Sequence, residues 1–248
     1  MLRGLWSAAS GMSAQKMTID VIANNLANVN STGFKKSTVE FQDLMYQTTK
    51  MAGAATADGG QIPTGIQVGM GTMPLGVHKL FMQGDFKQTG SELDLSIEGK
   101  GFFRVVSSGE ERYSRSGNFK LDAAGNIVTA NGDRLQPEMS VPANSTSIHV
   151  DQGGTVTTFD AEGAGAVLGV IELYTFANPA GLHSTGRNLY RASDASGEPT
   201  PGTPGLGGVG TIVQGALEMS NVDVVEEMVS MIMAQRAYEI NSKAVTSA

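Results

Sequence analysis

The chain has 248 residues, and its 24 Asp and Glu outnumber its 17 Lys and Arg, which gives a formal net charge of −7 at pH 7. An acidic chain without a basic run is not expected to bind nucleic acid, and the absence of cysteine excludes disulfide scaffolds, zinc fingers and thiol catalysis. No apolar run approaches the roughly 20 residues that a membrane-spanning helix needs, so we do not expect membrane insertion.

Residues 1–35 predict a long N-terminal helix. Apolar residues recur with the 3,4 spacing of a helical seam, interrupted only by Gln15. The members of this seam are Leu5, Ala8, Met12, Ile19, Ile22, Leu26 and Val29. We expect the helix to run for about 30 residues and to stop in the turn-forming stretch 30–33, with Gly33 as its cap. The first residues begin like a signal peptide, but serines and Lys16 interrupt the apolar core, so we expect no cleaved signal.

Residues 36–92 predict an extended connecting region. Within it, residues 50–76 are rich in Gly, Ala, Met and Thr and almost free of charge, and we expect neither helix nor clear strand there. Such a segment is a poor core former, so it either lies against neighbouring subunits or forms a flexible surface loop.

Residues 93–192 predict a central β domain built from hairpins. Short apolar runs alternate with turn signals, as in the strand expected at 102–106 and the hairpin expected over 119–129. Asn131 and Gly132 form a strong two-residue turn signal. The pattern Asp-x-x-Gly recurs at 151–154, so we expect stacked antiparallel hairpins rather than βαβ units.

Residues 193–214 predict a Pro/Gly-rich return connector. The glycines between 205 and 210 have the spacing of a dinucleotide-binding loop. They follow three prolines and precede β-branched residues instead of opening a helix, so we expect no nucleotide site there.

Residues 215–248 predict a C-terminal helix. We expect Ser220 or Asn221 to cap it. One apolar stripe comprises Val222, Val225, Val229 and Ile232, and a second, weaker one includes Met228, Met231 and Tyr238. Two stripes make an apolar surface wider than a two-stranded seam needs, which favours contacts with other subunits. The alternative is that each terminal helix packs separately on a globular core.

No constellation of catalytic residues stands out. The three histidines, His78, His149 and His183, lie far apart without metal-ligand spacing. Adjacent carboxylates such as Glu226 and Glu227 point in different directions, so we expect solvated charge rather than an acid/base pair. The sequence therefore predicts no enzyme, no metal and no cofactor.

The expected fold class is α+β. The long N- and C-terminal helices pair as a coiled-coil-like domain, and the central domain is mainly antiparallel β. The expected segments are 1–35 and 215–248 for the helical domain, 36–92 for the extended region, 93–192 for the β domain and 193–214 for the connector.

Four stretches resemble the rod and hook family of axial proteins of the bacterial flagellum. The most specific is residues 22–35, with Asn24, Asn25, Leu26, Ala27, Asn28, Gly33 and Phe34 as its signature. Residues 99–105 with 113–119, residues 122–137, and residues 220–223 with 235–243 resemble the central β motif and the C-terminal helix of that family. Residues 43–48 and 63–71 resemble the distal-rod members, and the members at the proximal–distal junction are the alternative. Family members usually continue the last helix beyond residue 248, which limits the terminal pairing expected of this chain.

The resemblance implies a mechanical role. Many copies would form a rigid hollow helical tube that transmits torque from motor to hook and carries the export channel. The implied partners are further copies, other rod proteins, the hook protein and the surrounding P- and L-ring proteins. The implied location is the periplasm-spanning basal body, reached through the flagellar export channel. A secreted polysaccharide-binding module and a cell-wall hydrolase are the alternatives from other classes.

Two sets of residues are the candidate functional sites. We expect packing between helices or subunits from Leu5, Met12, Ile19, Ile22, Leu26, Val29, Val222, Val225, Met228, Val229, Ile232 and Tyr238. The resemblance further implies a rod-stiffening segment with Tyr46, Gln47, Thr48, Pro63, Gly65, Gly69 and Gly71.

Overall fold

The computed structural model describes residues 2–53 and 63–247 of the chain. It comprises two compact units, each assembled from segments that are far apart in sequence. The helix–ribbon unit consists of Met1–Ala27, Ser37–His78 and Asp223–Ala248, and the β unit consists of Asn28–Lys36 and Lys79–Val222. The expected α+β class is confirmed, because two terminal helices in mutual contact accompany antiparallel sheets.

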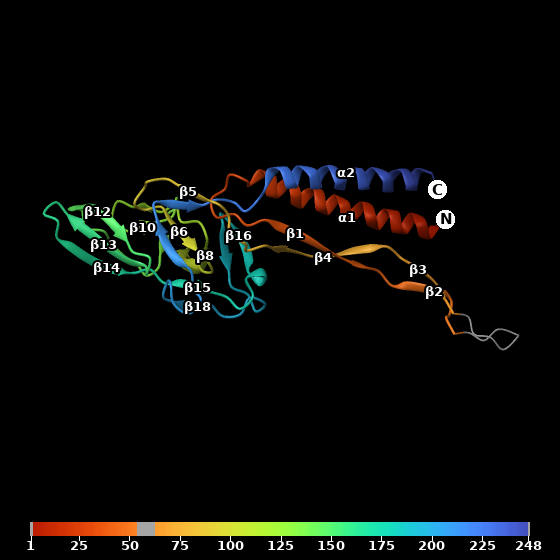
Figure 1. Ribbon diagram of the computed structural model, residues 1–248, viewed down its shortest axis with the longest axis horizontal. Coiled ribbons are helices and arrows are strands. Elements are labelled where there is room, and N and C mark those ends of the chain that lie inside the picture. The colour runs from red at the N-terminus through yellow and green to blue at the C-terminus, as the bar shows by residue number, and fades with distance from the viewer. Residues whose placement is uncertain (1, 54–62, 248) are drawn as a thin grey trace, which may run out of the picture. The chain divides into compact units, whose positions relative to one another are not determined.

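The helix–ribbon unit is built around two long helices, α1 (Leu2–Ala27) and α2 (Val224–Thr246). They lie side by side and run in opposite directions, so that the two chain ends meet at one end of the pair (Figure 1). In the described part of the chain, no helix is long and apolar enough to cross a bilayer.

Both helix boundaries differ from the sequence prediction. The first helix ends at Ala27 and not near residue 30, because Asn28 and Ser31 form a turn in which Ser31 N–H donates to Asn28 O at 3.1 Å. The seam residue Val29 therefore lies beyond the helix. The N-cap of α2 is Asp223, and not Ser220 or Asn221: its carboxylate accepts from Val225 N and Glu226 N at 2.8 and 3.0 Å.

A long ribbon of paired strands completes the helix–ribbon unit. Its strands are β1 (Ser37–Asp43) paired with β4 (Thr72–Lys79), and β2 (Tyr46–Lys50) paired antiparallel with β3 (Ile66–Gly69). The expectation of no clear strand over 50–76 is wrong for β3 and most of β4, since their partner strands, β2 and β1, lie earlier in the chain and outside the reach of a local pattern. Residues 54–62 of that stretch lie outside the described residues.

The β unit is a set of antiparallel sheets. The strands are β5 (Phe86–Gln88), β6 (Leu95–Glu98), β7 (Phe102–Ser107), β8 (Glu110–Ser114), β9 (Lys120–Leu121), β10 (Ile127–Val128), β11 (Arg134–Leu135), β12 (Ser145–Val150), β13 (Thr155–Asp160), β14 (Gly165–Val170), β15 (Leu173–Thr175), β16 (His183–Gly186), β17 (Leu189–Arg191), β18 (Thr200–Gly202), β19 (Thr211–Gln214) and β20 (Ala216–Glu218). The largest sheet has the strand order β16-β17-β8-β7-β11-β10-β9, with β15 joined to β7 and β18. A smaller sheet has the order β12-β13-β14, and two further pairs are β6–β19 and β5–β20. A 3-10 helix covers Pro179–Gly181.

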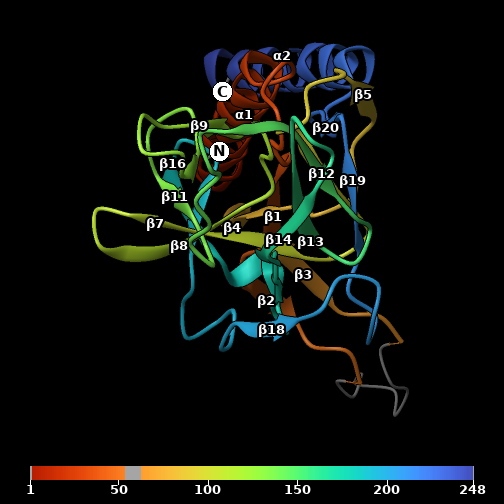
Figure 2. The same cartoon turned by 90° about the vertical axis from the view of Figure 1, so that its left-hand side faces the viewer.

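The hairpins read from the sequence are confirmed. The β7–β8 hairpin is prominent in Figure 2 and begins at the glycine pair 99–101. Strands β9 and β10 pair through Leu121 and Ile127, and the turn at Gly132 leads from β10 into β11. The Asp-x-x-Gly stretch closes the β12–β13 hairpin, where Asp151 N–H donates to Thr155 O at 3.0 Å.

The stretch expected as a connector carries strands. Within 193–214, β18 pairs with β15 and β19 pairs with β6, so this Pro/Gly-rich segment is part of the sheets of the β unit. The glycine cluster 205–210 forms a turn that leads into β19 and not into a helix, as expected. The sequence pattern missed the pairing because each strand is only three or four residues long.

Two apolar clusters fill the β unit. The larger joins mainly aliphatic residues from most of its strands, and Ile97, Phe103, Val156, Ile171 and Leu173 are fully enclosed in it. The smaller is mainly aromatic and comprises Phe102, Tyr113, Tyr174, Phe176, Leu182 and Tyr190. Its rings meet edge to face, as between Tyr113 and Phe176 at 4.9 Å between centroids.

Candidate assembly site

The residues of the N-terminal seam are covered to different degrees. Ala8 and Ile22 are buried, and Leu5, Met12, Ile19 and Leu26 are half-buried. The two helices approach closely near Gly11, because a Cβ atom there would lie 2.9 Å from Asn241 Nδ2. The absence of a side chain at this position therefore permits the close pairing.

The C-terminal helix packs on α1 through a different face from the one that carries its apolar stripe. Most of its residues turned inward are small or polar: Glu227 and Ala234 are buried, and Ala237 and Asn241 are half-buried, whereas Met231 is a half-buried large apolar residue. A seam of small residues lets two helices lie close together, as at Gly11. The apolar stripe is thereby left on the outer side.

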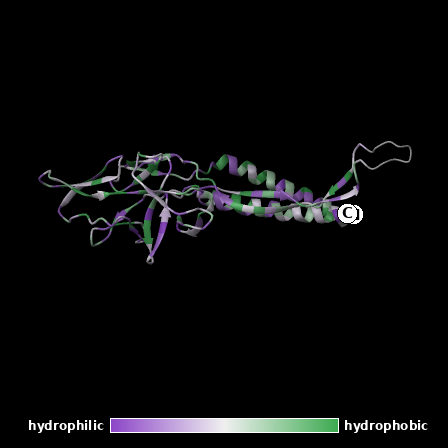
Figure 3. Cartoon of the chain, turned by 90° about the horizontal axis from the view of Figure 1, so that it is seen from below, coloured by the Kyte–Doolittle hydropathy of each residue, from purple (hydrophilic) through white to green (hydrophobic). Residues whose placement is uncertain are grey.

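That outer side is a broad apolar surface, which we call the outer face of α2. Val225, Val229 and Ile232 keep 70%, 51% and 48% of their surface exposed. The other exposed members are Val224, Met228, Met233, Tyr238 and Ile240, whereas Val222 is buried in the β unit. Figure 3 shows hydrophobic residues, in green, along both helices. Exposed apolar residues in this number on one helix are typical of an interaction surface.

Asn25 of the family signature joins three segments of the helix–ribbon unit. Its side chain is buried, and Nδ2 donates to Ser37 O at 2.9 Å and to Glu227 Oε2 at 3.1 Å. Its Oδ1 accepts from Ser37 N at 2.9 Å. One amide thus holds the end of α1, the start of β1 and the first turns of α2 together. Glu227 is correspondingly buried, and the expectation of a solvated carboxylate at this position is wrong.

The remaining signature residues divide between the two units. Asn24 and Ala27 are exposed on α1, and Leu26 is half-buried. In the β unit, Asn28 Oδ1 accepts from Ser31 Oγ at 3.1 Å.

Gly33 and Phe34 have separate structural roles. Gly33 has φ of +70°, and a Cβ atom on it would lie 2.6 Å from Ser116 N, so only glycine fits. Phe34 is buried beneath the ammonium of Lys79, which lies 4.6 Å from the ring centroid.

A buried ionic cluster in the β unit contains Lys35 and Arg115, which come from two of the stretches that resemble the family. Lys35 Nζ lies 2.6 Å from Glu218 Oε1 and donates to Met82 O at 2.7 Å. Arg115 Nε lies 3.2 Å from Glu218 Oε2, an ion pair without hydrogen-bond geometry. All three charged side chains are nine-tenths or more buried, and burial lowers the pKa of Lys35 and of Arg115.

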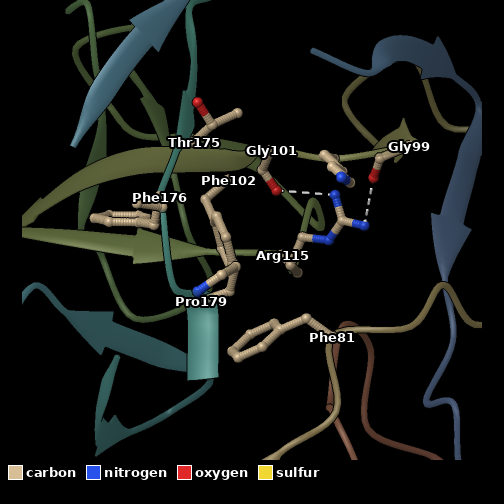
Figure 4. A pocket seen from close by; sticks show the side chains of 10 residues that line it. Phe81, Gly99, Gly101, Phe102, Arg115, Thr175, Phe176 and Pro179 are labelled. Carbon is tan, nitrogen blue, oxygen red and sulfur yellow. Dashed lines mark hydrogen bonds between the residues drawn. The ribbon is translucent and has the colours of Figure 1, made fainter. Parts of the chain in front are cut away.

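The guanidinium of Arg115 is also fixed by backbone carbonyls. It donates to Gly101 O and Gly99 O, both at 2.8 Å, as the dashed lines in Figure 4 show. Phe81, Phe102 and Phe176 line the same pocket, whose volume is about 190 Å³. Because both carbonyls accept hydrogen bonds from the guanidinium, Arg115 stabilises the surrounding backbone and does not present its charge to a ligand.

The expected stiffening segment lies on the ribbon. Tyr46, Gln47 and Thr48 belong to β2, and Gly69 sits opposite Tyr46 in β3, close enough that a Cβ atom on it would be 3.3 Å from the ring. Gly65 lies against the backbone of residues 50–52, and Pro63 is exposed.

The ribbon is fastened to α1 near Gly71. This residue has φ of +111°, and a Cβ atom on it would collide with Ser10 Oγ, which accepts from Thr72 N at 3.3 Å. The missing side chain at residue 71 therefore lets β4 lie directly on the first helix.

Sequence reasoning did not single out Arg115 or Glu218, and it assigned Glu227 to solvated charge. The only local signal is a lone charge inside an otherwise apolar or small-residue stretch, as at Glu218 between Leu217 and Met219. Such a charge is compatible with a solvated strand face, and only long-range contacts show it to be buried.

The comparisons with known proteins agree with this geometry. Residues 5–35 match the family described as "Flagella basal body rod protein", residues 96–158 match "Flagellar hook protein FlgE/F/G D1 domain", and residues 213–248 match "Flagellar basal body rod FlgEFG protein C-terminal". The three matches cover both terminal helices and the centre of the β unit.

Full-length relatives are similar along the whole chain. The chain is 43% identical to "Flagellar basal-body rod protein FlgG" of Buchnera aphidicola subsp. Schizaphis graminum, covering 100% of this chain and 96% of that protein. It is 45% identical to the protein of the same name from Borreliella burgdorferi, covering 99% and 94%, and 40% identical to that of Bacillus subtilis, covering 100% and 95%. A solved hook protein, FlgE2 of Helicobacter pylori, is 13% identical over 74% of this chain and 43% of its own, with a TM-score of 0.27, which is too low to support an argument.

Proposed function

This chain belongs to the family of flagellar basal-body rod proteins, and from that premise we propose how its helix–ribbon unit builds a rod. It is a structural subunit of the distal rod and not an enzyme. The FlgG relatives extend along the whole chain, which favours the distal-rod members of the family over those at the junction and leaves no support for the polysaccharide-binding module or the hydrolase.

We propose that copies of this chain join head to tail into a helical tube. A heterologous contact whose rotation does not close generates an open helical polymer. As a rod protein, the chain assembles in the basal body with other rod components. The proposed finer set of neighbours comprises further copies, the hook protein, and the P- and L-ring proteins around the rod.

The outer face of α2 is the observation that supports this proposal. Its valines, methionines and isoleucines stay 39% to 70% exposed while the opposite side of the helix is occupied by α1. Fully burying an aliphatic side chain contributes about 1.5–3 kcal/mol, and covering the part that is still exposed contributes a corresponding share of it. A face with several such residues therefore offers enough apolar surface to hold a neighbouring copy.

The ribbon supplies a second proposed contact. Its exposed apolar side chains on β2, β3 and β4, such as Tyr46, Ile66 and Leu75, have no core of their own in the described part of the ribbon. We propose that they lie against neighbouring copies and stiffen the tube. On this proposal, a deletion of residues 50–70 gives a softer, hook-like polymer, and a straight rigid rod after that deletion would contradict it.

The proposed location is the periplasm-spanning rod, reached through the flagellar export channel. Terminal segments that need partners for their full packing suit export in an unfolded state, because assembly then offsets the entropy cost of ordering them.

Electron cryotomography of basal bodies from cells that lack this gene tests the function. We expect the inner motor ring to remain, the rod to stop short and the hook to be missing. Complementation with the intact gene is the control and restores full-length rods. Normal rods and hooks, in cells without a second copy of the gene, would contradict the axial role.

A further inference from the structure

The helix–ribbon unit carries an unusual concentration of exposed thioethers. The chain has 13 methionines and no cysteine, so methionine sulfur is its only sulfur. Among the described residues of this unit, six methionines are exposed to between 38% and 86%: Met45, Met51, Met70, Met73, Met228 and Met233. The first four lie on or beside the ribbon strands, and the other two lie on the outer face of α2.

We propose that these six residues, here called the methionine set, are an oxidation site that controls assembly. This inference rests on the proposed function, because it requires the ribbon and the outer face of α2 to be covered in the polymer. The reagent is hydrogen peroxide. The sulfur lone pair attacks one peroxide oxygen, an S–O bond forms as the O–O bond breaks, and the second oxygen leaves as water. The thioether is oxidised to a sulfoxide by two electrons, and the peroxide is reduced.

Exposure decides which sulfurs react. Oxidation follows access, and no thiol in this chain competes for the oxidant. Met139 gives an internal reference, because it is 5% exposed in the core of the β unit and packs against Gly169. We therefore expect the methionine set to react before Met139.

The chemistry of the product explains the effect on assembly. A methionine side chain is flexible and apolar, and it fills irregular gaps between packed surfaces. Its sulfoxide carries a polar oxygen that must lose its water when a neighbour covers it, and this is costly unless a donor is supplied. One modification at each contact is repeated along the whole polymer, since every copy uses the same surfaces.

The test uses the purified full-length chain. Hydrogen peroxide is added in graded amounts, mass spectrometry locates each sulfoxide, and sedimentation with electron microscopy measures the critical concentration for polymer formation. We expect oxidation of the methionine set to raise that concentration by about tenfold or more. Treatment with methionine sulfoxide reductases and a thiol reductant then restores polymer formation.

Two variants separate these sulfurs from the rest. Replacing all six with leucine conserves volume and apolar character, and we expect that variant to polymerise after peroxide as well as before it. Met82→Leu is the matched control: Met82 is 68% exposed but lies in the β unit, so this variant should remain as sensitive as the wild-type chain. Circular dichroism before and after oxidation checks that both variants keep their helices.

Three outcomes would overturn the inference, and a fourth would contradict the proposed function. Undiminished polymer formation by wild-type chains that carry sulfoxides at all six positions overturns the inference, as does equal sensitivity of the six-leucine variant. Full methionine reactivity at these positions in the finished polymer also overturns it. A chain that stays monomeric before any oxidation contradicts the proposed function itself. Failure of the proposed function is therefore distinguishable from failure of the oxidation inference.

Discussion

Glu218 Oε1 lies 2.6 Å from Lys35 Nζ, and both side chains are completely buried although 183 residues separate them in the chain. Lys35 follows the first helix and Glu218 precedes the second. Gly33 N–H also donates to Glu218 O at 2.8 Å, so the two segments are joined by backbone and side chain alike. One carboxylate between two cations leaves a net positive charge, which the carbonyls of Met82, Gly99 and Gly101 help to stabilise.

Removal of the carboxylate charge is expected to destabilise the β unit strongly. Glu218→Gln leaves Lys35 and Arg115 buried without their counter-ion, and loss of one partner of a buried pair costs about 3–5 kcal/mol. Urea denaturation followed by tyrosine fluorescence measures the change. Glu138→Gln is the control, because its ion pair with Arg134 is exposed and should contribute less than about 1 kcal/mol. Equal effects of the two substitutions would show that the buried cluster adds no stability.

Alkaline pH is expected to weaken the β unit through two tyrosines. Burial raises the pKa of Tyr113 and of Tyr174 to about 12, and the nearby carboxylates Glu111 and Glu172 add to the shift. Between pH 10 and 12 the unfolded chain has released these protons while the folded chain keeps them. The free energy of unfolding therefore falls as pH rises through that window.

The ultraviolet absorbance of tyrosinate follows this titration, and denaturation at each pH follows the stability. Tyr113→Phe should make the fall shallower. A stability profile that stays flat from pH 10 to 12 in the wild-type chain would be inconsistent with protected phenols.

The amide of Asn25 is expected to be essential to the helix–ribbon unit. Asn25→Asp replaces the donor to Ser37 O and Glu227 Oε2 by an acceptor and brings two buried carboxylates together. We expect a loss of about 2–4 kcal/mol in the free energy of unfolding. Hydrogen exchange of the amides in α1 and α2 reports it. Gln235→Glu, at an exposed position of α2, is the control, and comparable exchange rates in both variants would argue against the network.

Gly33 is expected to tolerate no side chain. Gly33→Ala incurs about 1–2 kcal/mol for its left-handed backbone and adds a collision with the Ser116 backbone. Gly132 has φ of +86° with open space around its Cβ position, so Gly132→Ala isolates the backbone cost. Thermal unfolding should place Gly33→Ala clearly below Gly132→Ala, and identical melting temperatures would exclude the steric contribution.

A charge on the outer face of α2 is expected to block assembly while sparing the fold. Ile232 is 48% exposed in the single chain, so Ile232→Asp should change the free energy of unfolding by no more than about 1 kcal/mol. In a covered interface the same carboxylate is buried without a partner. Swimming assays and sedimentation measure assembly.

Gln235→Asp, at an exposed polar position of the same helix, is the matched control and should leave motility intact. Normal motility of Ile232→Asp cells would remove this face from the proposed interface.

Local patterns predicted most of the elements, although not their partners. The hairpins around Gly132 and Asp151 follow from turn residues that act within a few positions, and the seam of α1 follows from its apolar period. The predicted cap of α2 and the predicted end of α1 each differ from the observed position by a few residues, because several neighbouring polar side chains compete for the same role. Strands β3 and β18 were missed because three or four residues hold too little pattern without their partners.

The sequence by itself determined the family, the α+β class and the two long terminal helices, since helix period, turn chemistry and short motifs are local properties. Only the tertiary structure decided which face of α2 meets α1. Small residues and Glu227 permit a close approach, whereas the bulkier valine stripe remains outside. It also decided that Lys35, Arg115 and Glu218 are buried together, because a charge is tolerated in a core only where distant segments bring its counter-ion and carbonyl partners to it.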